Sequence, residues 1–103
     1  MPIKKRVRPP IHPGEILSEE FMKPFNLNAN KLGLELRVAP NRILAIVDGE
    51  RGISPDTALR LARFFGTSPE FWLNLQARYD LLTAQEALAE TIEQDVRPMA
   101  ASV

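Results

Sequence analysis

One helix-start signal occurs twice in the second half of the chain: a serine, then a proline, then an acidic residue. Ser-Pro-Asp at 54–56 and Ser-Pro-Glu at 68–70 each place a capping hydroxyl before a proline, which suits the first turn of a helix. Gly66, a typical helix stop, lies between them. The first signal leads into an apolar stripe at helical spacing, formed by Ala58, Leu61, Ala62 and Phe65. A chain divided in this way is expected to fold into short amphipathic helices.

Helix starts and stops also occur in the rest of the chain. No stretch alternates between apolar and polar residues for long enough to indicate a strand. Lys23-Pro24 marks a stop after a first helix, and Asn28 is a good N-cap for a second. We therefore predict an all-α fold with helices at about 13–22, 28–36, 40–48, 54–65, 68–79 and 83–95.

Apolar residues within these segments indicate which helix faces point inward. The stripes are Ile16, Leu17 and Phe21; Leu32, Gly33 and Leu36; Ile43, Ile46 and Val47; and Phe71, Trp72, Leu75 and Tyr79. The last group is core by default, although part of it could serve a dimer interface, where aromatic residues are enriched. The last helix offers only Leu88 and Ile92, so we expect it to dock on a partner or to fray.

Length and charge limit the possible functions. The chain has 103 residues, enough for one domain, and its net charge is zero. Residues 1–51 hold nine Lys/Arg against six Asp/Glu, and residues 52–103 hold four against seven. The basic half can therefore face DNA while the acidic half points away from it. We divide the chain into a basic arm at 1–11, a helical domain at 12–82, and a C-terminal helix and tail at 83–103.

Several classes of site and location are disfavoured. The chain has no cysteine and a single histidine, His12, which we interpret as a cap or packing residue rather than a metal ligand. The carboxylates Glu15, Glu19 and Glu20 have no convergent base or nucleophile, so we expect no enzyme, no cofactor and no metal. No apolar run is long enough to cross a membrane, and the basic start leads into prolines, so we expect a cytoplasmic protein.

The predicted helices at 28–36 and 40–48 form a helix-turn-helix candidate, because two helices of about eight residues are joined by a short turn. With Ile43, Ile46 and Val47 facing the core, Asn41 and Ala45 face outward, and Arg42 and Leu44 lie on the flanks. Asparagine and arginine at an exposed helix start can bond adenine and guanine edges in a major groove. The sequence therefore predicts a DNA-reading helix at 40–48.

Two runs make the family recognisable. His-Pro-Gly-Glu-Ile-Leu at 12–17, the helix pair above and the long run from Gly52 to Gln76 resemble HigA-type antitoxins, which are also called the VapI family. These belong to the Xre, or Cro/CI-like, repressors. The resemblance covers roughly residues 11–82. It implies a five-helix λ-repressor-like domain, to which the C-terminal helix is added here. It also implies a homodimer that represses its own operon and a partner toxin of the RelE-like, HigB-like mRNA-cleaving class.

The chain departs from the family pattern at several places. Arg37 occupies a turn position where relatives tend to have glycine and where a left-handed backbone is expected. Ala29 replaces a common glutamine, and Leu34, Leu44 and Ala45 replace polar residues. The expected DNA face is thus unusually apolar, although Leu44 and Ala45 could pack against thymine methyl groups.

The expected partner is double-stranded operator DNA. The candidate contact residues are Asn28, Asn30, Lys31, Arg37, Pro40, Asn41, Arg42, Leu44, Ala45 and Arg51. For Arg51 the expected contact is to phosphate, and a plain surface arginine is the alternative. The arm residues Lys4, Lys5, Arg6 and Arg8 either reach DNA or form a solubilising tail. Two other functions stay open: a stand-alone regulator without a toxin, and a protein-binding inhibitor with weak DNA affinity.

Overall fold

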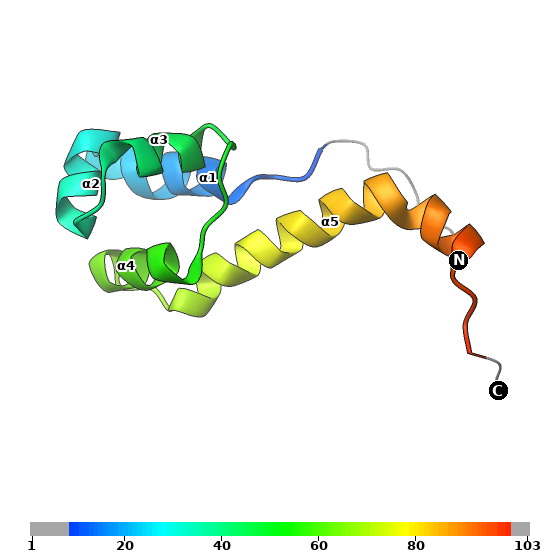
Figure 1. The fold of residues 1–103 in the computed structure, drawn as a ribbon. Coiled ribbons are helices and arrows are strands. Elements are labelled where there is room, and N and C mark those ends of the chain that lie inside the picture. Colours follow the sequence, from blue (N-terminus) through cyan, green and yellow to red (C-terminus); the bar gives the residue numbers. More distant parts are fainter. Residues whose placement is uncertain (1–8, 100–103) are drawn as a thin grey trace.

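The computed structural model describes residues 9–99, which fold as helices without a strand in that range. The first helical stretch comprises α1 (Pro13–Ile16), the π-helical η1 (Leu17–Met22) and the 3₁₀-helical η2 (Lys23–Phe25). It is followed by α2 (Ala29–Leu36), α3 (Pro40–Val47), α4 (Pro55–Phe65) and α5 (Pro69–Asp95). Figure 1 shows α1 to α4 gathered at one end of α5. The predicted all-α class is confirmed. The predicted arm residues 1–8, with their four cations, lie outside the described residues.

The first helix differs from the regular α-helix predicted at 13–22. After one α-turn the backbone widens into η1, passes Pro24 in the 3₁₀ turn of η2, and ends at Asn26. Pro24 lies in the first turn of η2, where a missing N–H is tolerated, so it does not end the helical stretch. The helical stretch ends at Asn26, whose backbone is left-handed (φ 54°, ψ 38°), a conformation that asparagine adopts more readily than most residues.

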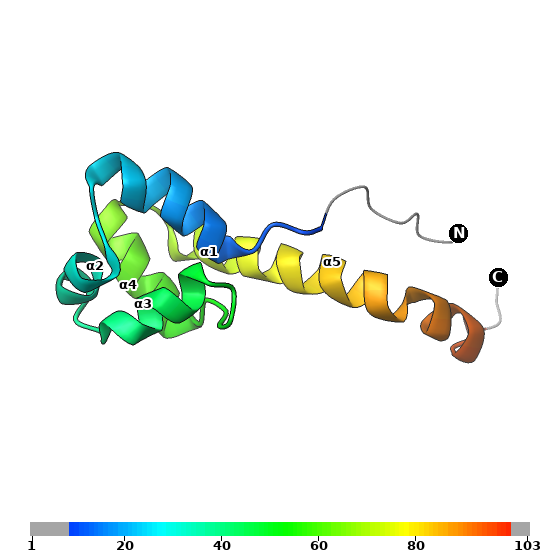
Figure 2. The ribbon, with the colours of Figure 1, turned by 90° about the horizontal axis from the view of Figure 1, so that it is seen from above.

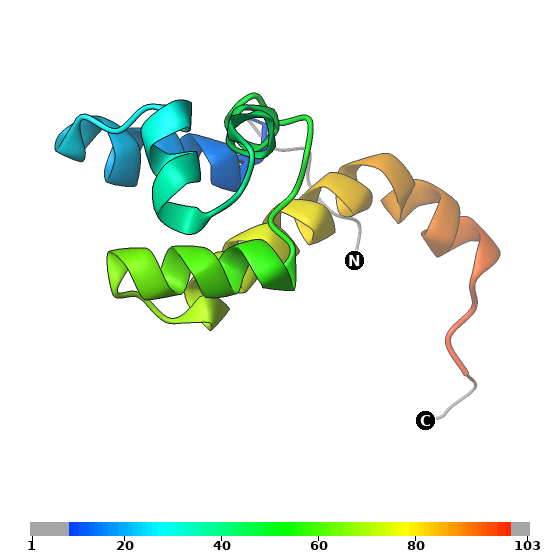
Figure 3. The same cartoon turned by 60° about the vertical axis from the view of Figure 1, so that its left-hand side comes forward.

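The predicted break between helices at 68–79 and 83–95 is wrong, since α5 runs through it for 27 residues. No glycine or proline occurs between Tyr79 and Thr83, so nothing interrupts the hydrogen-bond ladder there. The boundary drawn at residue 82 therefore falls inside a helix. The first part of α5 packs against α4 and α1, and the rest projects from the body, as Figures 2 and 3 show. This projection makes the molecule elongated, 54 × 26 × 20 Å.

The core lies where the first helical stretch, α2, α3, α4 and the start of α5 meet. Its centre is Trp72, fully buried, whose Nε1 donates to Thr67 Oγ1 at 2.8 Å. The Phe21 ring packs 4.8 Å from the indole, centroid to centroid. The buried set is Leu17, Met22, Leu32, Leu36, Ile43, Ile46, Ile53, Ala58, Leu61, Ala62 and Trp72. The predicted inward stripes supply all of this set except Met22 and Ile53, whereas Phe71, which was also predicted to point inward, is 37% exposed.

Two contacts fix α3 and the loop after it. Gly14 on α1 lies against the backbone of α3, because a Cβ at residue 14 would stand 1.8 Å from the Ile46 carbonyl oxygen. In the loop from α3 to α4, the Ile53 N–H donates to Gln76 Oε1 on α5 at 2.7 Å. Gln76 is itself held by Asp80, whose Oδ1 accepts from Nε2 at 2.9 Å. The helix expected to read DNA is thus supported on both sides.

Candidate DNA-binding surface

The helix-turn-helix consists of α2, a short turn and α3. The turn opens at Arg37, whose backbone is left-handed (φ 61°, ψ 44°), as the sequence predicted. The Val38 N–H then donates to the Gly33 carbonyl at 2.9 Å. Gly33 is required for this approach, since a Cβ there would stand 2.8 Å from the Val38 oxygen. The turn is therefore tight, and it stores strain at a non-glycine residue.

The start of α2 presents polar groups to solvent. Asn28 caps the helix, and its Oδ1 accepts the Lys31 N–H at 2.8 Å. Asn28, Asn30 and Lys31 are all exposed, whereas Ala29 is partly buried against the core. The cap role of Asn28 is confirmed. A contact of these three residues with DNA stays a prediction.

The outer face of α3 combines polar and apolar side chains. Pro40 begins the helix, Asn41 and Leu44 are exposed, and Ala45 is half-buried. Ile43 and Ile46 are fully buried on the opposite face, so the predicted division of this helix is confirmed. Leu44 is 48% exposed and offers no hydrogen bond, so the polar readout of α3 depends on few groups.

Arg42 is placed differently from a freely solvated side chain. Its Nη1 donates to Asp56 Oδ2 at 2.6 Å and lies 3.5 Å from Thr57 Oγ1, both at the start of α4. Its side chain is 27% exposed. The guanidinium thus lies between α3 and α4, with one edge held by a carboxylate.

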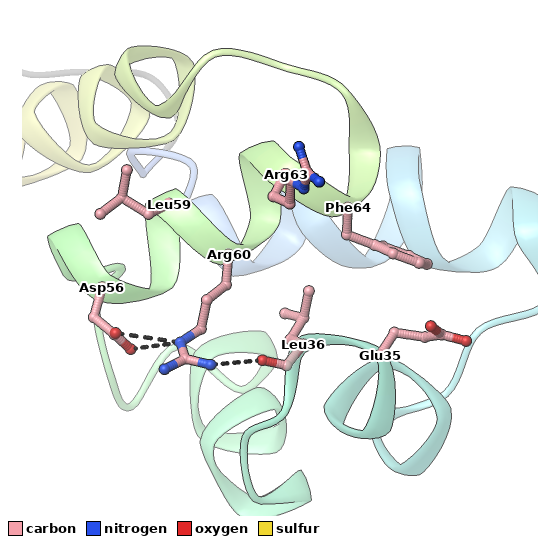
Figure 4. A pocket seen from close by; sticks show the side chains of 7 residues that line it. All are labelled: Glu35, Leu36, Asp56, Leu59, Arg60, Arg63 and Phe64. Atoms are coloured by element: carbon pink, nitrogen blue, oxygen red, sulfur yellow. Dashed lines mark hydrogen bonds and ion pairs between the residues drawn. The ribbon is translucent and has the colours of Figure 1, made fainter.

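Asp56 also binds Arg60, one turn further along α4. Arg60 Nε donates to Asp56 Oδ2 at 3.0 Å, and its Nη1 donates to the Leu36 carbonyl at the end of α2, 2.8 Å away (Figure 4). Hydrogen bonds from Arg42 and then from Arg60 lower the pKa of the Asp56 carboxyl. Sequence reasoning missed both residues. The i,i+4 spacing of Asp56 and Arg60 predicts their own pair, but nothing in the sequence indicated Arg42 as a third member.

The remaining candidates lie at the edges of this surface. Arg37 is exposed in the turn, and Arg51 is exposed in the loop after α3, following Gly49 with its left-handed backbone (φ 79°). The loop position of Arg51 agrees with the sequence prediction, and its contact with phosphate stays a prediction.

His12 lies at the start of α1 and next to the loop after α3, because a Cβ on Gly49 would stand 3.9 Å from its imidazole. Its Nδ1 accepts the Gly14 N–H at 2.9 Å, and its ring meets Tyr79 edge to face with centroids 4.8 Å apart. Burial lowers the pKa of the imidazole, although the Asp80 carboxylate acts in the opposite direction. The predicted cap and packing role is confirmed. Within residues 9–99, no group of three His, Asp or Glu side chains is placed to hold a metal ion. In the same range, no helix combines the length and apolarity needed to span a bilayer.

Comparison with known proteins agrees with this arrangement. The helix-turn-helix family HTH_3 matches residues 19–72. Virulence-associated protein I of Dichelobacter nodosus is 51% identical over 86 residues, which are 84% of this chain and 80% of that protein.

Solved structures show the same likeness. An addiction-module antidote protein of the HigA family from Coxiella burnetii is 52% identical with a TM-score of 0.84, over 88% of this chain and 99% of that one. The Pseudomonas aeruginosa antitoxin HigA, solved with the higBA promoter, is 45% identical with a TM-score of 0.86 over the same shares. Such identity over nearly the whole described structure, with the helix-turn-helix intact, shows that this chain belongs to the HigA-type branch of the Xre-type helix-turn-helix family of DNA-binding proteins.

Proposed function

We propose that this protein is a homodimeric transcriptional repressor that binds an operator in the promoter of its own operon. We further propose that it is the cytoplasmic antitoxin of a HigBA-type module and neutralises a RelE-like mRNA-cleaving toxin. The observation that carries the DNA-binding part is the exposed face of α3, held against the core by Ile43 and Ile46 in a fold whose 45%-identical relative was solved with promoter DNA.

The candidate residues divide into two roles. Asn41 and Arg42, near the start of α3, have donors suited to base edges, and Leu44 and Ala45 suit thymine methyl groups. We propose phosphate contacts for Asn28, Asn30 and Lys31 at the start of α2, for Arg37 at the turn, and for Arg51. Pro40 has no N–H to donate, so its proposed contact with DNA is one of packing only. Because few base-reading groups are polar, specificity rests mainly on Asn41 and Arg42.

The dimer is assigned to α5. Leu81, Leu88 and Ile92 are 58%, 48% and 51% exposed, and their spacing of seven and four residues puts them on one helix face. Phe71 and Leu75 keep some exposed surface nearer the body, whereas Trp72 is fully buried and cannot contact a partner. A two-fold pair would place two α3 helices about 34 Å apart on one face of DNA.

The antitoxin role is supported by the relatives, two of which carry the names antidote protein and antitoxin. The partner is then a small basic toxin encoded next to this chain. Its absence from the neighbouring gene would favour a stand-alone regulator.

The test is a titration of the protein against the promoter of its own operon and against scrambled DNA of equal length, at several salt concentrations. A repressor prefers its promoter at every salt concentration. The toxin part is tested by co-expression with the neighbouring gene product, where a stable complex and restored growth are expected. If the protein shows no preference for the promoter but forms a stable toxin complex, its function is that of a protein-binding inhibitor and not of a repressor. The 72% exposed Leu34 and the apolar Leu44 would then be candidates for contact with the toxin.

A further inference from the structure

We infer that Asp56 is a positioning residue for sequence recognition: it holds the Arg42 guanidinium at the DNA face and thereby raises specificity while lowering affinity for random DNA. This inference rests on the proposed operator binding. It starts from an unusual placement, since a carboxylate that is 54% exposed lies beside a residue expected to read bases.

The geometry leaves part of Arg42 available. Both of its side-chain contacts within residues 9–99, to Asp56 Oδ2 and Thr57 Oγ1, use the same nitrogen, Nη1. A guanidinium carries five donors in a planar fork, so contacts at Nη1 restrain the group while Nε and Nη2 keep donors for a base edge. A long side chain restrained in this way loses less rotamer entropy when it binds.

Asp56 is itself held in place. Arg60 donates to it from Nε and, through Nη1, to the Leu36 carbonyl, so the carboxylate is tied to the end of α2 as well as to α3 (Figure 4). The chain of contacts runs from the helix-turn-helix turn through α4 to the reading helix. Arg42 is therefore oriented relative to the whole motif and not to α3 alone.

The electrostatic effect of Asp56 has the opposite sign from its positioning effect. A carboxylate near the DNA surface repels phosphate and offsets part of the Arg42 charge, which weakens binding to every sequence. Removing the charge should therefore strengthen binding to random DNA and lower the preference for the operator. A purely structural role predicts a different result, because loss of fold weakens both kinds of binding together.

The experiment compares the operator-to-scrambled affinity ratio of the full chain with that of Asp56→Asn, Asp56→Glu and Glu35→Gln, with melting temperature as the check on folding. Glu35 is the matched control, since it is an exposed carboxylate that lines the same open groove between α2 and α4. We expect the ratio to fall by about tenfold in Asp56→Asn, within the range of one good base contact, with a higher affinity for scrambled DNA. Asp56→Glu should restore part of the ratio, and Glu35→Gln should leave it unchanged.

A second arm uses the Arg42→Ala background. If Asp56 acts through Arg42, then Asp56→Asn does not lower the operator-to-scrambled affinity ratio any further in the Arg42→Ala variant. An unchanged ratio in the single variant, a parallel fall of both affinities, or an equal further loss in the Arg42→Ala background would each overturn the inference. Wild-type protein without any promoter preference would instead overturn the proposed repressor function and this inference with it.

Discussion

Gly14 and Ile46 are in direct backbone contact, so close that a Cβ on residue 14 would stand 1.8 Å from the Ile46 carbonyl oxygen. This contact sets the distance between α1 and α3. It explains how a helix of only eight residues stays in place: its inner face meets the backbone of α1 as well as side chains of the core.

Gly14→Ala should therefore destabilise the fold, although alanine favours helices. We expect a loss of about 2–3 kcal/mol in the free energy of unfolding, because overpacking against rigid backbone outweighs the gain in helix propensity of about 1 kcal/mol. Urea unfolding measures it. Gly66→Ala is the comparison: it has open space around its Cβ but a φ of 76°, so its loss should be smaller, about 1 kcal/mol. Equal losses would mean that the α1–α3 contact is not tight.

Arg37→Gly should stabilise the protein by a few tenths to about 1 kcal/mol, because it relieves the left-handed strain, partly offset by a more flexible unfolded chain. Thermal unfolding measures the change. Asn26→Gly is the control, since asparagine tolerates its φ of 54° better and should gain less. A clear fall in melting temperature for Arg37→Gly would contradict strain at the turn.

Substitutions of base-contacting residues and of phosphate-contacting residues should change DNA affinity in different ways. Asn41→Ala or Arg42→Ala should lose about 1–3 kcal/mol on the operator, with little change on random DNA for Asn41 and a modest one for the charged Arg42. Arg51→Ala should weaken binding to both DNAs and make the salt slope shallower by about 0.9 per lost phosphate contact. The measurement is a titration of all three variants at several salt concentrations. Equal losses on both DNAs for Asn41→Ala would remove it from the base readout.

Leu88→Glu should break the proposed dimer, because it puts a charge in the middle of the exposed apolar face of α5. Sedimentation at tens of micromolar should then show monomer, and operator affinity should fall because two half-sites are no longer read together. Thr83→Glu adds the same charge on the opposite face and should leave the dimer intact. Wild-type protein that is monomeric both alone and on operator DNA would refute the dimer itself.

His12 should make stability depend on pH below neutrality. Its folded-state pKa lies below the usual 6.5, so the unfolded chain binds the proton more readily and stability falls as pH drops through this range. A protonated imidazole also cannot accept the Gly14 N–H. Urea unfolding from pH 7.5 to 5 should show this decline. His12→Asn keeps an N-cap acceptor without the titration and should flatten the curve.

Much of the fold could be predicted from local sequence. The Ser-Pro-acidic starts, the caps at His12 and Asn28, and the buried stripes of α2, α3 and α4 agree with the structure, because each depends on residues within one or two turns of one another. The positive φ at Arg37 was also predicted. The π-helical η1 was not, since no residue near Leu17 marks it in the sequence. The continuous α5 was missed too, although the absence of glycine and proline between Tyr79 and Thr83 favours it.

Local sequence patterns were enough to predict where most helices begin, which faces they bury and which family the chain resembles. How the recognition surface is held depends on contacts between helices. Arg42 was predicted as an exposed side chain, and it lies against Asp56, 14 positions away on another helix. Likewise, the Ile53 N–H donates to the Gln76 side chain on another helix, and the Leu36 carbonyl accepts from Arg60 on another helix. Helical periodicity and capping act over a few residues and leave a pattern in the sequence. Contacts between helices depend on packing angles and distances, which are fixed only when all the helices share one core.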